Sequence, residues 1–318
     1  MHVLQPAPLF SEIAEGPENG MAFWVKSDDG MRIRVGIWGQ DISKHGTIVL
    51  FPGRTEYIEL QGRTARDLTR QGFAVLTMDW RVHGLSDRVL SIRETLHVNR
   101  YSDYQLDVAA IIKAAKSLDV PEPWFLLGNS MGGCIGLRAL FDGLPVAACA
   151  FTAPMWGVKM LSLQKAVALP VTWTAHAIGR GHSYIPGHNG KNYVLNNPFE
   201  GNRITRDEGM YNFWLKQARA KPCLQTAGST MRWLHQSLLE CRRLAKMSSP
   251  DVPCVAFCGD NDGLVEVNAI SRRLAGWSNG SFEQIPGAKH ALLLEVPEVR
   301  NRIIAKIAGH FIGSLREM

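Results

Sequence analysis

The stretch Trp124-Phe-Leu-Leu-Gly-Asn-Ser-Met-Gly-Gly-Cys134 decides the fold of this chain. Its apolar start is typical of a strand buried on both faces of a parallel sheet, and apolar residues at helical spacing follow from Cys134 to Phe141. Between the two, Gly128, Ser130 and Gly132 form the pattern G-x-S-x-G, which at a strand-to-helix turn indicates a nucleophilic serine. Glycine is required beside the serine because side chains there would collide with the neighbouring strand or helix. We therefore predict that Ser130 is a nucleophile.

Segments with strand and helix character alternate on both sides of this turn. Short apolar or alternating runs predict eight strands, at residues 22–26, 31–38, 47–51, 73–78, 124–127, 146–151, 252–257 and 281–285. Apolar residues at three- and four-residue spacing predict helices at 58–70, 102–117, 134–141, 265–275 and 297–315. The sequence therefore predicts an α/β fold with a mostly parallel eight-stranded sheet flanked by helices.

The alternation stops after Pro154 and resumes near residue 251. We therefore predict a core domain of residues 1–154 and 251–318, with residues 155–250 inserted as a cap, or lid. A second match to G-x-S-x-G, at Gly276 to Gly280, follows a predicted helix and precedes a predicted strand. This order is the reverse of the one that a nucleophilic serine requires, so we interpret Ser278 as a turn residue.

A serine hydroxyl needs a general base and a carboxylate that orients this base. The predicted strand 252–257 leads into Asp260 and Asp262, and the predicted strand 281–285 leads into His290. Both loops lie at the carboxyl edge of the sheet, where active sites of open α/β folds form. We predict that His290 is the base and that Asp260 or Asp262 is the acid, the other aspartate holding the loop or capping the next helix.

Two backbone N–H groups are candidates for stabilising an oxyanion. Met131 begins the helix after the nucleophile, so its N–H points toward the reacting group. The second donor is expected in the loop after the predicted strand 47–51, and we assign it to the N–H of Arg54.

Five motifs allow a comparison with a known family. They read Phe51-Pro-Gly-Arg54, Asp79-Trp-Arg-Val-His-Gly-Leu-Ser86, Gly128-Asn-Ser-Met-Gly-Gly133, Gly259-Asp-Asn-Asp262 and Gly287-Ala-Lys-His290. With these motifs the chain resembles the serine α/β-hydrolases of the monoacylglycerol lipase and bacterial lysophospholipase group, from Phe23 to Ile312. The chain departs from the family pattern at Pro52, where monoacylglycerol lipases have histidine, and at Val82, where glycine is usual.

The resemblance implies roles for further residues. The family pattern G-x-x-D favours Asp262 as the acid. The segment Asn202 to Asp207 resembles a cap segment that precedes a helix in these enzymes, and the cap is expected to be a helical lid over the active site. Its candidate acyl-chain pocket is lined by Met155, Trp156, Phe213, Trp214 and Trp233.

These residues predict a carboxylic ester hydrolase that forms an acyl-enzyme on Ser130 and acts on a lipid-like amphiphile, such as a lysophospholipid or a monoacylglycerol. Acyl transfer by the same residues is one alternative. A binding protein of this fold without catalytic activity is another, although each catalytic position is filled here.

Positive charge gathers in the predicted cap. Residues 155–250 contain 13 basic and four acidic residues, a formal charge of +9, whereas the rest of the chain carries −3. We hypothesise that this charge attracts anionic head groups or an anionic membrane surface.

The remaining features predict neither a metal nor another cofactor. The six cysteines are scattered without ligand spacing, and His176, His182 and His188 share no helix or strand face. The basic residues follow no nucleic-acid recognition motif. Since no apolar run is long enough to span a bilayer and the N-terminal residues do not resemble a secretory signal, we expect a cytoplasmic protein that can contact the inner face of the membrane.

Overall fold

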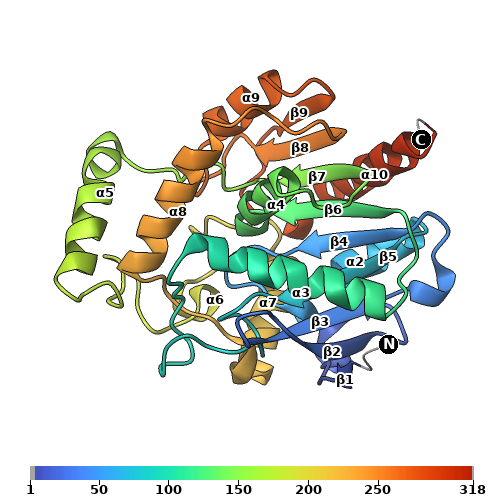
Figure 1. The fold of residues 1–318 in the computed structure, drawn as a ribbon, viewed down its shortest axis with the longest axis horizontal. Helices are drawn as coiled ribbons and strands as arrows, with labels where there is room; N and C mark the ends of the chain where they lie inside the picture. Colours follow the sequence, from blue (N-terminus) through green and yellow to red (C-terminus); the bar gives the residue numbers. More distant parts are fainter. Residues whose placement is uncertain (1–3, 317–318) are drawn as a thin grey trace.

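The structure is a computed structural model that describes residues 4–316, and its centre is one sheet of nine strands (Figure 1). The strands lie in the order β1-β2-β3-β5-β4-β6-β7-β8-β9. Their bounds are β1 (Gln5–Pro6), β2 (Met21–Lys26), β3 (Arg32–Trp38), β4 (Thr47–Phe51), β5 (Ala74–Asp79), β6 (Trp124–Asn129), β7 (Ala148–Thr152), β8 (Cys254–Gly259) and β9 (Gly280–Ile285).

The sheet is antiparallel at one edge and parallel elsewhere. The pairs β1/β2, β2/β3 and β3/β5 are antiparallel, and the pairs from β5 through β4 and β6 to β9 are parallel. The predicted mostly parallel α/β fold is therefore confirmed, with all eight predicted strands present. The additional strand, β1, has two residues, one of them proline, so it carries no alternation from which a strand can be predicted.

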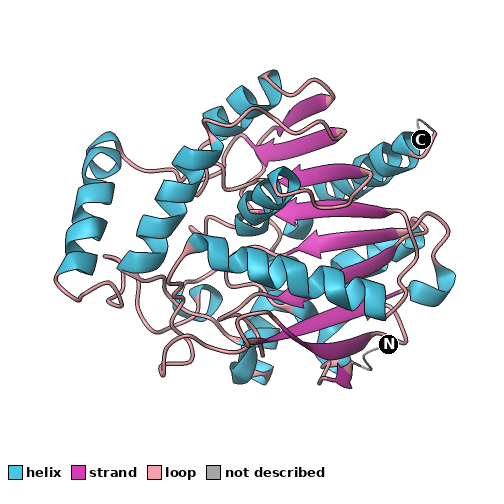
Figure 2. Cartoon of the chain, viewed as in Figure 1, coloured by secondary structure: helices cyan, strands magenta, loops and turns pink. Residues whose placement is uncertain are grey.

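Helices cover both faces of the sheet (Figure 2). On one face, α3 (Tyr104–Ser117), α4 (Met131–Phe141) and α9 (Val267–Ala275) contribute to the apolar core. On the other face, α2 (Gly62–Arg70) and α10 (Pro297–Ser314) do so. Shorter segments are α1 (Ser11–Ala14), η1 (Gln40–Ile42), η2 (Ile58–Gln61), η3 (Tyr101–Asp103), η4 (Pro222–Leu224) and η5 (Leu292–Leu294). Coverage of both faces explains why the central strands lack polar alternation.

The predicted cap contains four helices within the described part of the chain. They are α5 (Ser162–Ala177), α6 (Tyr193–Asn196), α7 (Glu208–Ala220) and α8 (Met231–Leu244). Figure 1 shows α5 and α8 beyond the carboxyl ends of the parallel strands, where Thr172 Oγ1 and His235 Nδ1 join them at 2.9 Å. In residues 4–316 no helix combines the length and the apolar composition needed to cross a membrane. The boundaries 155 and 250 remain a prediction.

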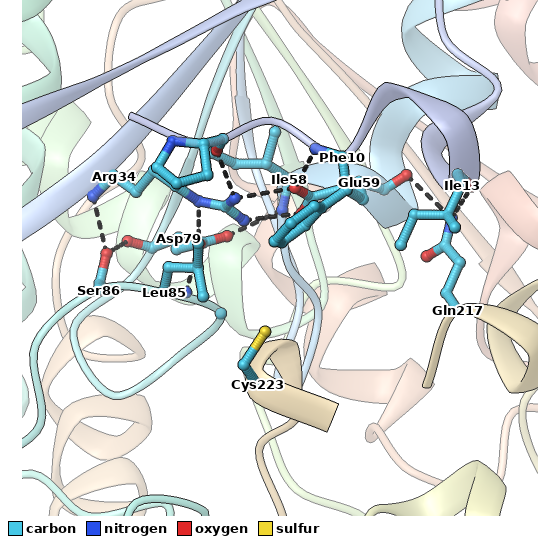
Figure 3. Close-up of polar contacts among 12 residues, drawn as sticks. Phe10, Ile13, Arg34, Ile58, Glu59, Asp79, Leu85, Ser86, Gln217 and Cys223 are labelled. Atoms are coloured by element: carbon cyan, nitrogen blue, oxygen red, sulfur yellow. Dashed lines mark hydrogen bonds and ion pairs between the residues drawn. The ribbon is translucent and has the colours of Figure 1, made fainter. Parts of the chain in front are cut away.

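A buried ionic network joins β3 to the carboxyl end of β5 (Figure 3). Arg34 Nε donates to Asp79 Oδ2 at 2.7 Å, and its two terminal nitrogens donate to Glu59 at 2.8 and 2.7 Å. None of the three side chains is exposed. Glu59 also accepts the N–H of Phe10, and Gln217 of α7 donates to the carbonyl of Glu59. The network therefore ties the N-terminal segment and one cap helix to the core.

Val82 shows the structural reason for a family feature. Its φ is +63°, in the left-handed region that β-branched residues rarely adopt, and its side chain is buried. The family pattern that the sequence resembles has glycine at this position, and glycine takes up such a φ without steric cost. In this chain Val82 adopts this left-handed conformation in place of a glycine.

Candidate active site

The turn between β6 and α4 holds Ser130 in a strained conformation. Its φ and ψ are +49° and −114°, outside the regions that residues with a side chain normally occupy. A Cβ on Gly132 would lie 2.0 Å from the carbonyl oxygen of Phe51, so only glycine fits there. The N–H of Ser130 donates to the carbonyl of Thr152 at 2.9 Å, and the carbonyl of Ser130 accepts the N–H of Met155 at 2.9 Å. The sharp turn therefore directs the hydroxyl away from the sheet, as the sequence pattern requires.

Ser130, His290 and Asp262 form one continuous chain of hydrogen bonds. His290 Nε2 lies 2.8 Å from Ser130 Oγ, and His290 Nδ1 lies 2.7 Å from Asp262 Oδ2. An ionised carboxylate only accepts, so Nδ1 carries a proton that it donates to Asp262, and Nε2 is free to accept the proton of Ser130. The three residues come from the ends of β6, β8 and β9, which parallel pairing brings to one edge of the sheet.

The two candidate acids, Asp260 and Asp262, lie in different environments. Asp262 is fully buried and its Oδ1 accepts the N–H groups of Leu264 and Val265 at 2.7 and 3.0 Å. Burial acts to raise the pKa of Asp262, but His290 and these N–H donors outweigh it and lower the pKa below its ordinary value. Asp260 instead accepts the N–H of Gly287 at 2.6 Å and is exposed. Asp260 therefore holds the loop together, the role expected for the aspartate that does not face the histidine.

The two predicted oxyanion donors are unengaged. Within residues 4–316, neither the N–H of Arg54 nor that of Met131 has an intramolecular acceptor. The N–H of Gly53, next to Arg54, donates to Glu56 Oε2 at 2.6 Å. Both free N–H groups adjoin the turn that holds Ser130, so they are available to a developing negative charge.

Glu56 supports this loop and is a residue that sequence reasoning missed. Besides the N–H of Gly53, its carboxylate accepts from Gln61 at 3.0 Å and from Asn129 at 2.7 Å. Asn129 precedes Ser130 directly, so Glu56 links the loop of Arg54 to the turn of the nucleophile. Burial raises the pKa of Glu56, an effect that outweighs its hydrogen bonds and His290. No motif signals this role, because it depends on contacts between distant segments.

A cavity of about 340 Å³ opens onto Ser130 and His290. Three of the five predicted pocket residues line it, namely Met155, Trp214 and Trp233. Further apolar side chains of the lining come from the cap and from the loop after β8: Val158, Met160, Ile185, Ile204, Leu234, Leu264 and Val265. Its charged lining residues are Arg54, Lys159, Arg203 and Glu56. The cavity is therefore mainly apolar, with more cations than carboxylates.

The other two predicted pocket residues, Trp156 and Phe213, are not among the residues that line this cavity. Trp156 packs against Phe151 and Trp277, and its indole N–H donates to the carbonyl of Gly133 at 3.0 Å. Phe213 is buried in the core of the cap with the guanidinium of Arg63 over its ring. Both rings are buried by packing against the core, which an aromatic residue in a sequence does not distinguish from a pocket wall.

The segment Asn202 to Asp207 contacts the loop of the histidine. Lys289, next to His290, donates to the carbonyl of Asn202 at 2.8 Å, and the N–H of Ala291 donates to the carbonyl of Ile204 at 2.8 Å. Asp207 caps α7 by accepting the N–H of Met210. This cap segment thus fixes the loop that carries His290.

Comparisons with known proteins find relatives over most of the chain. The family described as serine aminopeptidase, S33 (Hydrolase_4) matches residues 42–297. Lysophospholipase L2 of Escherichia coli is 29% identical over 276 residues, covering 83% of this chain and 79% of the relative. A probable lysophospholipase L2 of Haemophilus influenzae is 26% identical over 268 residues, covering 84% and 83%.

Solved structures share the fold. A soluble variant of monoglyceride lipase from Saccharomyces cerevisiae, in complex with a substrate analog, has a TM-score of 0.71 at 17% identity and covers 91% of this chain and 94% of its own. Monoacylglycerol lipase of Paleococcus ferrophilus has a TM-score of 0.67 at 18% identity, covering 89% and 99%.

Proposed function

Because the chain belongs to the serine aminopeptidase S33 family of hydrolases, we propose that it is a carboxylic ester hydrolase that cleaves lipid-like amphiphiles, such as lysophospholipids or monoacylglycerols. The observation that carries this proposal is the unbroken hydrogen-bond chain from Asp262 through His290 to Ser130. The names of the curated relatives, which are lysophospholipases, support the lipid substrate class.

The reaction begins with attack of Ser130 Oγ on the ester carbonyl while His290 Nε2 takes the hydroxyl proton. The carbonyl oxygen becomes an oxyanion between the N–H groups of Arg54 and Met131. His290 then returns its proton to the leaving alcohol, and the acyl group stays on Ser130 as an ester. Water, activated by His290 in the same way, releases the fatty acid and restores the serine.

Asp262 orients His290 and supports its positive charge during each proton transfer. Its lowered pKa keeps the carboxylate ionised at neutral pH. Glu56 and Asn129 act as positioning residues, because they hold the loop of Arg54 against the nucleophile turn and touch no reacting atom in this scheme.

The apolar lining of the cavity supports an acyl chain as the group next to the carbonyl. Met155, Trp214 and Trp233 line it together with aliphatic residues of the cap. Burial of apolar surface stabilises such a complex by about 25 cal/mol per Å², so a long acyl chain gains more than a short one.

Hydrolysis of matched substrates tests the proposal. The purified protein should release fatty acid from a lysophospholipid and a monoacylglycerol of the same chain length, faster than from a short-chain ester or an aminoacyl anilide. Ser130→Ala should abolish release, and Asp262→Asn should lower kcat by about 10⁴-fold because the imidazole loses its orienting partner. Fatty-acid release that persists in Ser130→Ala would contradict the proposal. An added alcohol that captures most of the acyl group would instead favour acyl transfer.

We also propose peripheral contact with an anionic lipid surface through residues 155–250. Their formal charge of +9 supports it, as do exposed apolar side chains on and beside α5, namely Leu161, Leu163, Trp173 and Ile178. Sedimentation with anionic vesicles that is weaker at high salt would agree with this contact, and equal sedimentation with neutral vesicles would contradict it.

A further inference from the structure

Arg54 has a second feature besides its backbone N–H. Its guanidinium is partly buried at the cavity, where it donates to Ser229 Oγ at 3.0 Å and lies 5.7 Å from the ring centre of Trp233. No carboxylate of residues 4–316 lies within ion-pair distance of it. Burial lowers the pKa of Arg54, and an electrostatic interaction with Tyr104 acts in the opposite direction. A guanidinium remains charged at neutral pH even so, and this charge therefore lacks a partner.

The charge is not cancelled by Glu56, although the two residues are separated by one position. Both oxygens of Glu56 accept from neutral donors, Oε1 from Asn129 and Oε2 from Gly53 and Gln61. Glu56 thus holds the loop together by hydrogen bonds to neutral donors, and it forms no ion pair with the guanidinium of Arg54.

Two neighbouring groups extend this cation into a binding site. The N–H of Ser229 donates to His188 Nδ1 at 3.0 Å, so the imidazole carries its proton on Nε2 when it is neutral. Burial and the charge of Arg54 lower the pKa of His188 to about 4, which keeps it neutral at pH 7. Arg54, the Nε2–H of His188 and the hydroxyl of Ser229 therefore offer hydrogen-bond donors around one point of the cavity wall.

A smaller pocket of about 80 Å³ lies on the other side of this group. It shares Arg54, Thr55, His188 and Tyr193 with the cavity of Ser130. Lys191 and Asn189 also line it, and no acidic residue does within the described part of the chain. One space is therefore mainly apolar and contains the nucleophile, and the adjoining one is polar and cationic.

We propose that Arg54 and His188, each hydrogen-bonded to Ser229, bind the anionic phosphodiester of the substrate's head group in the smaller pocket and make the enzyme selective for anionic over neutral amphiphiles. A guanidinium donates two parallel hydrogen bonds to phosphate oxygens. A neutral glycerol head group has no anionic oxygens that accept such charge-assisted bonds. In a lysophospholipid the glycerol backbone joins the phosphodiester to the ester, so one molecule occupies both spaces. This assignment rests on the proposed ester hydrolysis at Ser130.

The test compares kcat/KM for lysophosphatidylglycerol and for the monoacylglycerol with the same acyl chain, both below their critical micelle concentrations. In Arg54→Gln the ratio of the two values should fall about 10- to 100-fold, the effect of losing charge-assisted hydrogen bonds. Arg54→Lys keeps the charge but not the paired donors, so its ratio should fall less. Arg180→Gln removes an exposed arginine that lines neither space, and its ratio should change less than about threefold.

An equal loss with both lipids would overturn the proposal, because Arg54 would then serve only the oxyanion loop. Failure of the proposed function is distinguishable, since the wild type would then hydrolyse neither lipid. Binding gives a second reading that needs no turnover. Calorimetry on Ser130→Ala should find at least about tenfold tighter binding of lysophosphatidylglycerol than of monoacylglycerol, and equal affinities would contradict the proposal. Inorganic phosphate that inhibits monoacylglycerol hydrolysis only when Arg54 is present, without any lysophospholipid preference, would identify a free-phosphate site instead.

Discussion

Arg34 is fully buried and Arg54 is partly buried, but only Arg34 forms ion pairs with carboxylates. Arg34 is fully buried between Glu59 and Asp79 and donates to both (Figure 3). These carboxylates raise the pKa of Arg34 despite its burial, whereas burial lowers the pKa of Arg54. Arg54 lies at the cavity of Ser130, where its guanidinium contacts the hydroxyl of Ser229 and the ring of Trp233.

The difference separates a charge used for the fold from a charge available for a ligand. A buried charge is costly unless it is paired, so a folded chain usually provides the partner itself. At Arg34 the partners come from η2 and β5, and they join three segments of the chain. At Arg54 the partner is missing from residues 4–316, beside the residues assigned to catalysis. Substitution of Arg34 should therefore lower stability, whereas substitution of Arg54 should lower ligand selectivity and leave stability nearly unchanged.

The largest effect is expected from Arg34→Met. It leaves Glu59 and Asp79 buried without their cation, and breaking a buried ion pair in this way costs about 3–5 kcal/mol. Urea denaturation measures the change in the free energy of unfolding. Arg70→Met is the matched control, because Arg70 is exposed and 3.8 Å from Asp67, and a surface pair contributes about 0–1 kcal/mol. A cost for Arg34→Met as small as that of the control would show that the buried ion pairs of Arg34 stabilise the fold no more than a surface pair does.

A smaller, pH-dependent effect is expected from Glu56→Gln. Burial raises the pKa of Glu56 above its ordinary value of 4.5, so the folded state holds this proton more tightly than the unfolded state. The wild type should therefore lose stability relative to Glu56→Gln as the pH rises from about 4.5 through the raised pKa. Denaturation at several pH values checks this sign. A wild type that gains stability relative to the variant over that range would show that Glu56 is stabilised as an anion.

The smallest effect on stability is expected from Arg54→Met, the same substitution as at Arg34. It removes one hydrogen bond to Ser229 and an unpaired charge, so the free energy of unfolding should change by no more than about 1 kcal/mol. The same urea titration serves as the measurement. A loss comparable with that of Arg34→Met would mean that Arg54 is a structural residue, and the contrast between the two would disappear.

Much of the fold could be predicted because its signals are local. The buried strands β4 to β8 are short apolar runs, and the glycines around Ser130 mark the turn within a few residues. The loops of Asp262 and His290 follow strands directly, so their convergence at one edge follows from parallel pairing.

The rest depends on contacts between distant segments. Glu56 meets Asn129 and Arg54 meets Ser229 across 73 and 175 positions, and no local pattern predicts such pairs. The positions of Trp156, in a loop, and Phe213, on α7, have the same origin, because composition does not tell whether a buried aromatic ring faces the cavity or the apolar core. From the sequence, the basic residues of the predicted cap are the candidates for attracting anionic head groups. The cation proposed to bind an anionic head group, Arg54, lies instead in the predicted core domain.

The most direct test of the account is covalent labelling of the protein by a fluorophosphonate, followed by mass mapping of the modified peptide. An activated serine attacks this reagent, so we expect one label on Ser130, none in Ser130→Ala, and much slower labelling in Asp262→Asn. A label on another residue would contradict the assignment of Ser130 as the nucleophile. So would the absence of a label on folded wild type that binds an unreactive compound with the same alkyl chain as the reagent.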